Sequence, residues 1–285
     1  MDFVSAFAPA RSVNAFSLTI FWAFFAMTLI VFCDQIALRL HNRSLLLEST
    51  GSKRGWSSLL AIGALAGLML DGVGQWLGKL WIYPYWSTGM YAATFVIGFA
   101  GYWMAIAESY VAVSAILRIW RPAPRAPDAV TLDRSKLFRV AGVAGIALAA
   151  GGIALGAQAY RPIGGYSFDI RTPTVLRAPL SSLFLTCTGL WLALEWAQQA
   201  HRRESFLSCL LNGDRVPLYA MLLASEAFGF LWESVNSAHH FWRYTNWPLA
   251  DVQLFGAPVA VLLSWPLQYV MFLSLGFLLD RSLWR

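Results

Sequence analysis

Charged residues are scarce in this chain. Only 13% of its 285 residues are Asp, Glu, Lys or Arg, whereas a soluble domain carries about a quarter. Hydrophobic residues make up 58%, and the mean hydropathy is +0.55. This composition excludes an ordinary soluble enzyme. It predicts an integral membrane protein, which we place in a bacterial inner (plasma) membrane.

Cysteine and lysine are also rare. The three cysteines lie in or next to apolar runs without a CxxC spacing, so we interpret them as packing residues. Lys53, Lys79 and Lys136 lie in loops or at the ends of apolar runs, which excludes a retinal Schiff base in mid-membrane. No hydrolase or phosphate-loop motif is present. His239 and His240 lack a third ligand, so we expect no metal and no cofactor.

Seven apolar runs are long enough to cross a membrane as helices. With the N-terminus outside, fifteen Lys and Arg residues lie on the cytoplasmic side and six outside, as the positive-inside rule requires. We interpret these cations as orientation signals and expect no nucleic-acid partner. The predicted fold is an all-α polytopic bundle of seven transmembrane helices, N-out and C-in. The runs are 16–38, 57–78, 90–117, 138–158, 180–198, 216–236 and 254–279.

The segments between and before the runs carry two smaller predictions. Residues 121–136 are rich in Pro and charge, which is typical of a solvated loop. The first residues are polar and the run after them is of spanning length, so we expect no cleavable signal peptide.

Three features recur about 161 positions apart, which indicates an internal repeat. An acid followed by His and Arg ends the first and fifth runs, an acid precedes W-x-Y-x-x-W in both halves, and a Trp followed by a polar residue lies deep in the third and seventh runs. The predicted units are 16–118 and 177–280, joined by the connector helix 138–158. Because four helices separate equivalents, the units form a parallel 3+1+3 arrangement with a cavity between them. The paired positions are Asp34 and Glu195, Asp71 and Glu233, Trp103 and Trp265, and Glu108 and Gln268.

Carboxyl groups within membrane spans are candidates for function, because burying them is costly. The catalytic candidates are Asp71, Glu233 and Glu226. Glu226 and Glu233 are seven residues apart, which predicts one helix face, and the repeat predicts Asp71 and Glu233 on opposite walls of one cavity. A buried carboxyl group can stay protonated at neutral pH and protonate a carbon–carbon double bond. The alternative for this pair is a structural contact between helices, and Asp34 and Glu195 are interpreted as interfacial ion-pair residues.

Aromatic side chains accompany these acids and could stabilise a carbocation while excluding water. For Trp86 and Trp247 the alternative is an interfacial aromatic belt. Asn236 follows Glu233 by three residues and either hydrogen-bonds within the site or caps the helix. The predicted substrate-binding residues are Trp76, Trp81, Tyr83, Trp103, Glu108, Trp232, Asn236, Trp242, Tyr244 and Trp265.

The second half of the chain resembles membrane enzymes of terpenoid metabolism. The segments WESVN (232–236), FWRYT (241–245) and LFGAPVAVLLSW (254–265) together resemble the three-helix lycopene cyclase domains of bacteria, archaea and fungi. The stretch LFGAP followed by SWP is also similar to membrane-embedded carotenoid hydratases, and a similar seven-helix layout with a Trp-Glu pair occurs in membrane cyclases of prenylated aromatic compounds.

This resemblance covers residues 226–280 best, and it implies chemistry on terpenoid double bonds without a metal or redox cofactor. The cyclase domains are used in pairs, as the repeat also suggests. They carry Pro-x-Glu-Glu at the start of their third helix, whereas Pro258 is followed here by VAV. Any acid role therefore falls on Asp71, Glu226 or Glu233.

These observations lead to function hypotheses from different classes. The first is a metal-independent cyclase (an isomerase) or hydratase (a lyase) that protonates a double bond of an apolar isoprenoid or carotenoid-type lipid. Glu233 or Asp71 is then the proton donor and the other acid its partner or base. The second is a non-catalytic lipid- or pigment-binding subunit of a membrane complex. A transporter is a third hypothesis, which a parallel repeat favours less. The partners in the first two are a hydrophobic lipid and the surrounding membrane lipids, and the sequence leaves the oligomeric state open.

Overall fold

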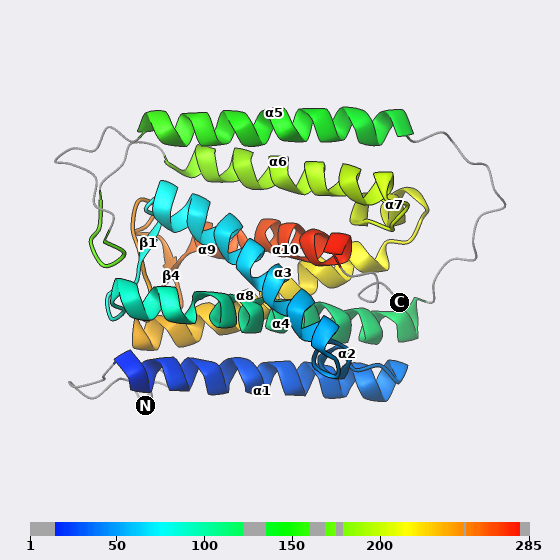
Figure 1. Cartoon of the computed structure of the whole chain (residues 1–285), viewed down its shortest axis with the longest axis horizontal. Helices are drawn as coiled ribbons and strands as arrows, with labels where there is room; N and C mark the ends of the chain where they lie inside the picture. Colours follow the sequence, from blue (N-terminus) through cyan, green and yellow to red (C-terminus); the bar gives the residue numbers. More distant parts are fainter. Residues whose placement is uncertain (1–14, 122–134, 160–168, 175–178, 248, 280–285) are drawn as a thin grey trace.

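The computed structural model describes residues 15–121, 135–159, 169–174, 179–247 and 249–279 (Figure 1). These residues are mostly helical, which confirms the all-α prediction. Each long helix overlaps one of the seven predicted runs. Residues 122–134 of the expected loop, and both chain ends, lie outside the described residues. The long helices are α1 (Ala15–His41), α3 (Lys53–Asp71), α4 (Thr88–Trp120), α5 (Ser135–Ala159), α6 (Pro179–Ala200), α8 (Val216–His239) and α10 (Trp265–Leu279).

Five stretches of the described chain are long and apolar enough to cross a membrane, which supports a membrane protein. Helices α6 and α8 have 22 and 24 residues but do not belong to this group. Part of the reason in α8 is its two glutamates, which lower the mean hydropathy of the helix. The five stretches are Phe16–His41, Lys53–Trp76, Thr88–Trp120, Ser135–Ala157 and Val259–Leu279.

The two ends of the bundle differ (Figure 1). The short helices α2 (Leu45–Thr50) and α7 (Phe206–Leu211) lie at one end, called here the short-helix end. The opposite end, the strand end, holds β1 (Trp81–Ile82), β2 (Arg243–Tyr244), β3 (Gln253–Leu254) and β4 (Ala257–Pro258). Near this end α3 continues as the π-helix η2 (Gly72–Leu77), and the one-turn helix α9 (Val259–Leu262) precedes α10.

The strands at the strand end form two antiparallel pairs. Strand β1 pairs with β2 so that Trp81 lies opposite Tyr244, which joins segments that are far apart in the sequence. Strand β3 pairs with β4 around a turn in which Phe255 and Gly256 both have positive φ, as the tightest hairpin turns require. The first pair brings the two W-x-Y segments together, and each of these segments follows the helix that carries Asp71 or Glu233.

Small residues allow α5 and α6 to pack closely at one edge of the bundle (Figure 1). A Cβ atom at Gly189 would lie 2.4 Å from the backbone nitrogen of Ala149 and 2.4 Å from the carbonyl oxygen of Gly145. Such contacts are typical of helix pairs in membranes, where small residues let two backbones approach. At the other edge α1 packs against α4, which also contacts α3 and α8. Helices α4, α8 and α10 therefore contact one another at the centre.

Candidate functional site

Glu233 lies buried on α8, and its carboxyl group accepts a hydrogen bond from the strand end. The Tyr244 hydroxyl donates to Glu233 Oε1 at 2.5 Å, and the Trp242 indole nitrogen donates to the Tyr244 hydroxyl at 2.7 Å. Asn236 holds the Trp242 backbone on both sides, since its amide accepts from the Trp242 nitrogen and donates to the Trp242 carbonyl, each at 3.1 Å. The Asn236 carbonyl also accepts from His240 at the end of α8. Asn236 thus positions the segment from Trp242 to Tyr244, whose tyrosine bonds the Glu233 carboxyl group.

Asp71 ends α3 and accepts the same kind of hydrogen-bond chain. The Tyr83 hydroxyl lies 3.1 Å from both Asp71 carboxylate oxygens, and the Trp81 indole nitrogen donates to the Tyr83 hydroxyl at 3.2 Å. Tyr91 on α4 donates a further hydrogen bond to Asp71. The side chain of Asp71 is completely buried. Each half of the polypeptide therefore contains a hydrogen-bond chain that runs from a Trp indole through a Tyr hydroxyl to a carboxyl group.

The two tyrosines in these chains act as donors. Burial, and next the charge of the neighbouring carboxyl group, raises the pKa of both Tyr83 and Tyr244 well above the usual value. Both phenols therefore keep their protons at neutral pH. An indole nitrogen can only donate, so the direction of each chain is fixed from Trp through Tyr to the acid.

A cavity of about 550 Å³ lies among α1, α4, α6, α8, α10 and the strand end. Its walls are predominantly apolar, and nearly half of the lining residues are aromatic. Glu233 lines it directly, whereas Asp71 lies behind two of its tyrosine donors. The residues from the two hydrogen-bond chains that line it are Trp81, Tyr83, Tyr91, Glu233, Trp242 and Tyr244.

Tyr102 on α4 also lines this cavity, in the same wall as Glu233 and the two tyrosines that bond Asp71. Its ring packs against Trp232 at 5.2 Å between centroids, and Gln268 on α10 donates to its hydroxyl group at 2.6 Å. Glu233 and the two tyrosines that bond Asp71 therefore line one shared cavity, whereas Asp71 itself does not line it.

Glu233 and Asp71 differ in the state of their second carboxylate oxygen. Both oxygens of Asp71 accept hydrogen bonds from tyrosines. Glu233 Oε2 is buried and has no hydrogen-bond partner among the described residues. The side chain of Trp265 lies next to the same carboxyl group. An unpaired buried oxygen is costly, so it needs an explanation, and beside a cavity a ligand or a reaction that uses the oxygen provides one.

The cavity reaches the flank of the bundle. Met27 on α1, Ile97 on α4 and Phe184 on α6 line it, and all three are also exposed at the surface. Met27 and Ile97 belong to stretches that are apolar enough to cross a membrane. The cavity therefore has a route toward the surface that lipid would cover.

Glu226 does not belong to this site. The spacing predicts it on the same face of α8 as Glu233, but its side chain is exposed and does not line the cavity. Buried positions on α8 recur every four residues, as Ser225, Gly229 and Glu233 illustrate. Because a helix turn takes 3.6 residues, this buried stripe winds around α8, and Glu226 falls outside it.

Four predicted substrate-binding residues also lie outside the cavity lining, and one of them is Asn236, whose amide bonds the Trp242 backbone instead. Trp76 is exposed on η2 and stacks on Phe95. Trp103 is buried between helices, where its indole nitrogen donates to the Phe272 carbonyl at 3.0 Å. Glu108 is completely buried next to Asp34, toward the short-helix end. The Trp103 indole is thus accounted for by its bond to α10, whereas both carboxylate oxygens of Glu108 are buried without a hydrogen-bond partner among the described residues.

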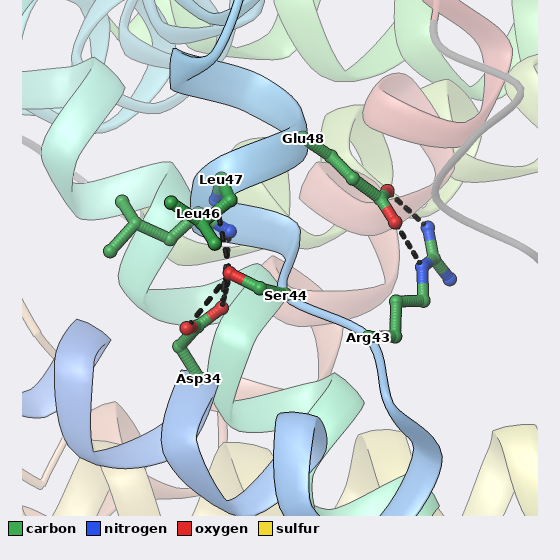
Figure 2. Close-up of polar contacts among 6 residues, drawn as sticks. All are labelled: Asp34, Arg43, Ser44, Leu46, Leu47 and Glu48. Atoms are coloured by element: carbon green, nitrogen blue, oxygen red, sulfur yellow. Dashed lines mark hydrogen bonds and ion pairs between the residues drawn. The ribbon is translucent and has the colours of Figure 1, made fainter.

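Asp34 and Glu195 are buried and accept hydrogen bonds from neutral donors, so the prediction of interfacial ion pairs is wrong. Asp34 accepts from the Ser44 hydroxyl at 2.7 Å and from the Leu46 backbone nitrogen at 3.2 Å, at the start of α2 (Figure 2). Arg43 pairs instead with Glu48 (Figure 2). A helix N-terminus has unpaired N–H groups and a positive dipole, and both favour a carboxylate there.

Glu195 has the same role at α7. It accepts a hydrogen bond from the Leu207 backbone nitrogen at 3.1 Å and another from the Trp191 indole at 2.9 Å. Both acids therefore hold a short helix against a long one.

The sequence interpretation overlooked several residues of the cavity. Tyr91, Tyr102 and Trp22 line it without having been predicted, and Trp86 and Trp247 are buried in its wall, so the interfacial belt does not describe them. The available signal was the presence of hydroxyl-bearing rings within a 33-residue apolar helix, α4. Trp22 carried no such signal, because a Trp in an apolar run is typical of any membrane helix.

No group of three or more His, Cys, Asp or Glu residues in the described part of the chain could hold a metal ion. The ring of His239 packs against Phe21 with 4.7 Å between centroids.

Comparison with known proteins gave no relative: no family model, no curated protein and no solved structure matches this chain. The chemistry is therefore argued from the cavity itself.

Proposed function

We propose that this chain is a metal-independent membrane enzyme that protonates a carbon–carbon double bond of an isoprenoid or carotenoid-type lipid. The outcome of the reaction is cyclisation or hydration. The observation that carries the proposal is Glu233, a buried carboxyl group with one oxygen unpaired among the described residues, in the wall of an aromatic cavity. A carboxyl group in such a place favours its neutral, proton-donating form.

In this mechanism Glu233 transfers its proton to one carbon of the double bond. The π electrons form the new C–H bond, and the other carbon becomes a cation. The Tyr244 hydroxyl, 2.5 Å from Glu233 Oε1, stabilises the carboxylate that remains. The rings of Trp232, Trp265 and Tyr102 line the cavity, where they can stabilise the cation by cation–π attraction and limit the access of water.

The cation then has two outcomes. In cyclisation, a second double bond of the lipid attacks it, and a neighbouring carbon loses a proton to the Glu233 carboxylate, so the product is an isomer. In hydration, water adds and its surplus proton returns to the same carboxylate. Both routes regenerate the acid. Asp71 acts as its structural partner by holding Tyr83 and Tyr91 in the cavity wall.

We also propose that the chain crosses the membrane seven times, N-out and C-in, as a parallel repeat. Two pairs of matching contacts support a repeat. Asp34 and Glu195 each accept from the first turn of the following short helix, at positions Leu46 and Leu207, which are 161 residues apart. Likewise, the Trp–Tyr–acid chain occurs once in each half.

A lateral route for the lipid follows from the position of the cavity. Met27, Ile97 and Phe184 mark where the cavity meets the exposed flank of the bundle. A substrate that is dissolved in the bilayer could then enter without passing through water.

The test is to compare lipid extracts from cells that produce the wild-type chain, Glu233→Gln or Glu226→Gln. The first variant keeps the side-chain size and removes the acidic proton, so it should abolish the new lipid product. The second changes an exposed carboxyl group on the same helix and should leave the product unchanged. Product formation by Glu233→Gln at the wild-type level would reject the proposal.

A lipid- or pigment-binding subunit is the second candidate, because tyrosine hydrogen bonds to both acids also suit a structural role. Mass spectrometry of the purified chain distinguishes it. A bound, unmodified lipid that Glu233→Gln retains equally well would favour binding alone.

A further inference from the structure

The aromatic cavity contains a hydrogen-bonded pair whose polar groups the proposed chemistry does not use, although it uses the ring of Tyr102. Tyr102 on α4 and Gln268 on α10 both line it, and the Gln268 amide nitrogen donates to the Tyr102 hydroxyl oxygen at 2.6 Å. The Tyr102 oxygen is therefore an acceptor in this contact, and its own proton remains available. Within the described chain, neither that proton nor the Gln268 carbonyl oxygen has a further hydrogen-bond partner.

Other hydroxyl groups of the cavity are already engaged. The Thr94 hydroxyl donates to the Met90 carbonyl at 2.9 Å, and the Ser264 hydroxyl donates to the Val261 carbonyl at 2.7 Å. Each of these bonds stays within the segment that carries the hydroxyl. The Tyr102–Gln268 pair differs because it spans two helices and presents one donor and one acceptor to the cavity.

We propose that Tyr102 and Gln268 bind a hydroxyl group of the lipid, so that the substrate is an oxygenated isoprenoid and not a pure hydrocarbon. An alcohol fits both free positions, since its oxygen accepts from Tyr102 and its proton goes to the Gln268 carbonyl. A hydrocarbon leaves both groups unpaired in an apolar space, which is unfavourable. This inference rests on the proposed function for the isoprenoid nature of the ligand.

The position of the pair also gives the hydroxyl group a role in orientation. The ring of Tyr102 packs on Trp232, the residue before Glu233 on α8, and Tyr102 and Glu233 line the same cavity. A lipid held there by its oxygen would present a fixed part of its chain to the Glu233 carboxyl group. Tyr102 and Gln268 are thus specificity residues, while the proton comes from Glu233.

The test uses retinol and the hydrocarbon in which a methyl group replaces its CH₂OH group. Both polyenes accept energy from the tryptophans of the cavity wall, so binding to the purified full-length chain is read from the loss of tryptophan fluorescence. We expect retinol to bind about tenfold more tightly than the hydrocarbon. Tyr102→Phe and Gln268→Leu should each reduce that ratio to about twofold or less, while affinity for the hydrocarbon stays the same.

The matched control is Thr94→Val, which removes a cavity hydroxyl that is already bonded within its own helix. It should keep the full preference for retinol. Two results would overturn the inference: equal binding of the two probes by the wild-type chain, or a preference that survives in both variants. Because Tyr102 and Gln268 lie on different helices, misfolding of one variant leaves the other as a test.

The same probes separate this inference from the proposed function. Glu233→Gln should lose product formation in cells and yet keep the preference for retinol. If Glu233→Gln still makes product, the proton-donor assignment fails, and the retinol ratio in Tyr102→Phe and Gln268→Leu still decides the hydroxyl site.

Discussion

Glu233 and Asp71 receive the same kind of hydrogen-bond donor, yet their surroundings leave them different chemistry. Asp71 is enclosed by Tyr83 and Tyr91, which use both of its oxygens. Glu233 has one oxygen bonded by Tyr244 and one without a partner in the described chain, beside the cavity. A carboxyl group that is fully engaged is suited to holding its neighbours. One that is partly engaged is suited to exchanging a proton.

The first prediction concerns Asp71→Asn. The amide offers one acceptor oxygen where the carboxylate offers two, so one tyrosine hydroxyl loses its partner. We expect a loss of about 1–3 kcal/mol in the free energy of unfolding, with product formation only partly reduced. Thermal unfolding in detergent and lipid extraction, done side by side, measure the two effects. Complete loss of product from a variant of wild-type stability would instead make Asp71 a proton donor.

The second prediction concerns Tyr244→Phe. It removes the donor to Glu233 Oε1 and leaves the Trp242 indole nitrogen without its acceptor. The carboxylate formed after proton transfer then lacks its stabilising hydroxyl group, so the turnover rate should fall about tenfold while substrate affinity changes little. Initial rates at several lipid concentrations in reconstituted vesicles provide the measurement. A change in affinity alone would show that Tyr244 serves binding and not the reaction.

At this scale the sequence predicted the two central acids because their cost in a membrane is high and their W-x-Y context is repeated. Residues seven apart share a helix face, but the buried face itself winds around α8. Glu226 was therefore misassigned, because the face that is buried at Glu233 is exposed two turns earlier. Tyr91 and Tyr102 were overlooked because their roles depend on the distance to partners on other helices, Asp71 and Gln268. Spacing along one helix cannot reveal such distances.

Among the elements, the long helices could be predicted and the short ones could not. Each of the seven apolar runs overlaps a helix, because length and hydropathy are local properties. Helices α2 and α7 have six residues each and are held by Ser44, Ser205 and the buried acids Asp34 and Glu195. The strands have two residues each and exist through pairing across the chain. Such elements follow from tertiary contacts that the sequence pattern does not display.

The third prediction tests the close packing of α5 and α6. A methyl group at Gly189 would meet the Gly145 carbonyl and the Ala149 nitrogen at 2.4 Å, so Gly189→Ala must push the helices apart. We expect it to lower the free energy of unfolding by about 1–3 kcal/mol. The matched control is Gly151→Ala on α5, where nothing lies within 4 Å of the added Cβ and the helix should gain about 0.5–1 kcal/mol. Thermal unfolding of both variants in one detergent gives the comparison, and equal stability of the two would contradict the packing.

For the molecule as a whole, the strand end is the element that brings the halves together. The pairing of β1 with β2 and the contact of α4 with α8 place residues of both halves around one cavity. The internal match of the sequence predicted a cavity between halves. It could not predict that Tyr83 and Tyr91 would separate Asp71 from the cavity, because that depends on the path of the segments that follow α3 and α8.

The fourth prediction concerns orientation. In a chain whose native cysteines are replaced by alanine, single cysteines are placed at Asp251, exposed near the strand end, and at Glu48, exposed at the short-helix end. A maleimide that cannot cross membranes should label position 251 in intact cells. It should label position 48 only after the membrane is opened. The opposite pattern would reverse the N-out, C-in orientation.

Transfer of a proton from solvent to carbon, by way of Glu233, is the central claim, and a reaction in D₂O tests it most directly. The purified chain, equilibrated in D₂O and in excess over the lipid that disappears from cells producing it, converts that lipid in a single turnover, before Glu233 can reuse a proton taken from the substrate. The product is analysed by mass spectrometry after washing in ordinary water. Protonation of the double bond predicts one deuterium that remains on carbon in the wild-type product and no such product from Glu233→Gln. A product that carries no deuterium on carbon would contradict the mechanism.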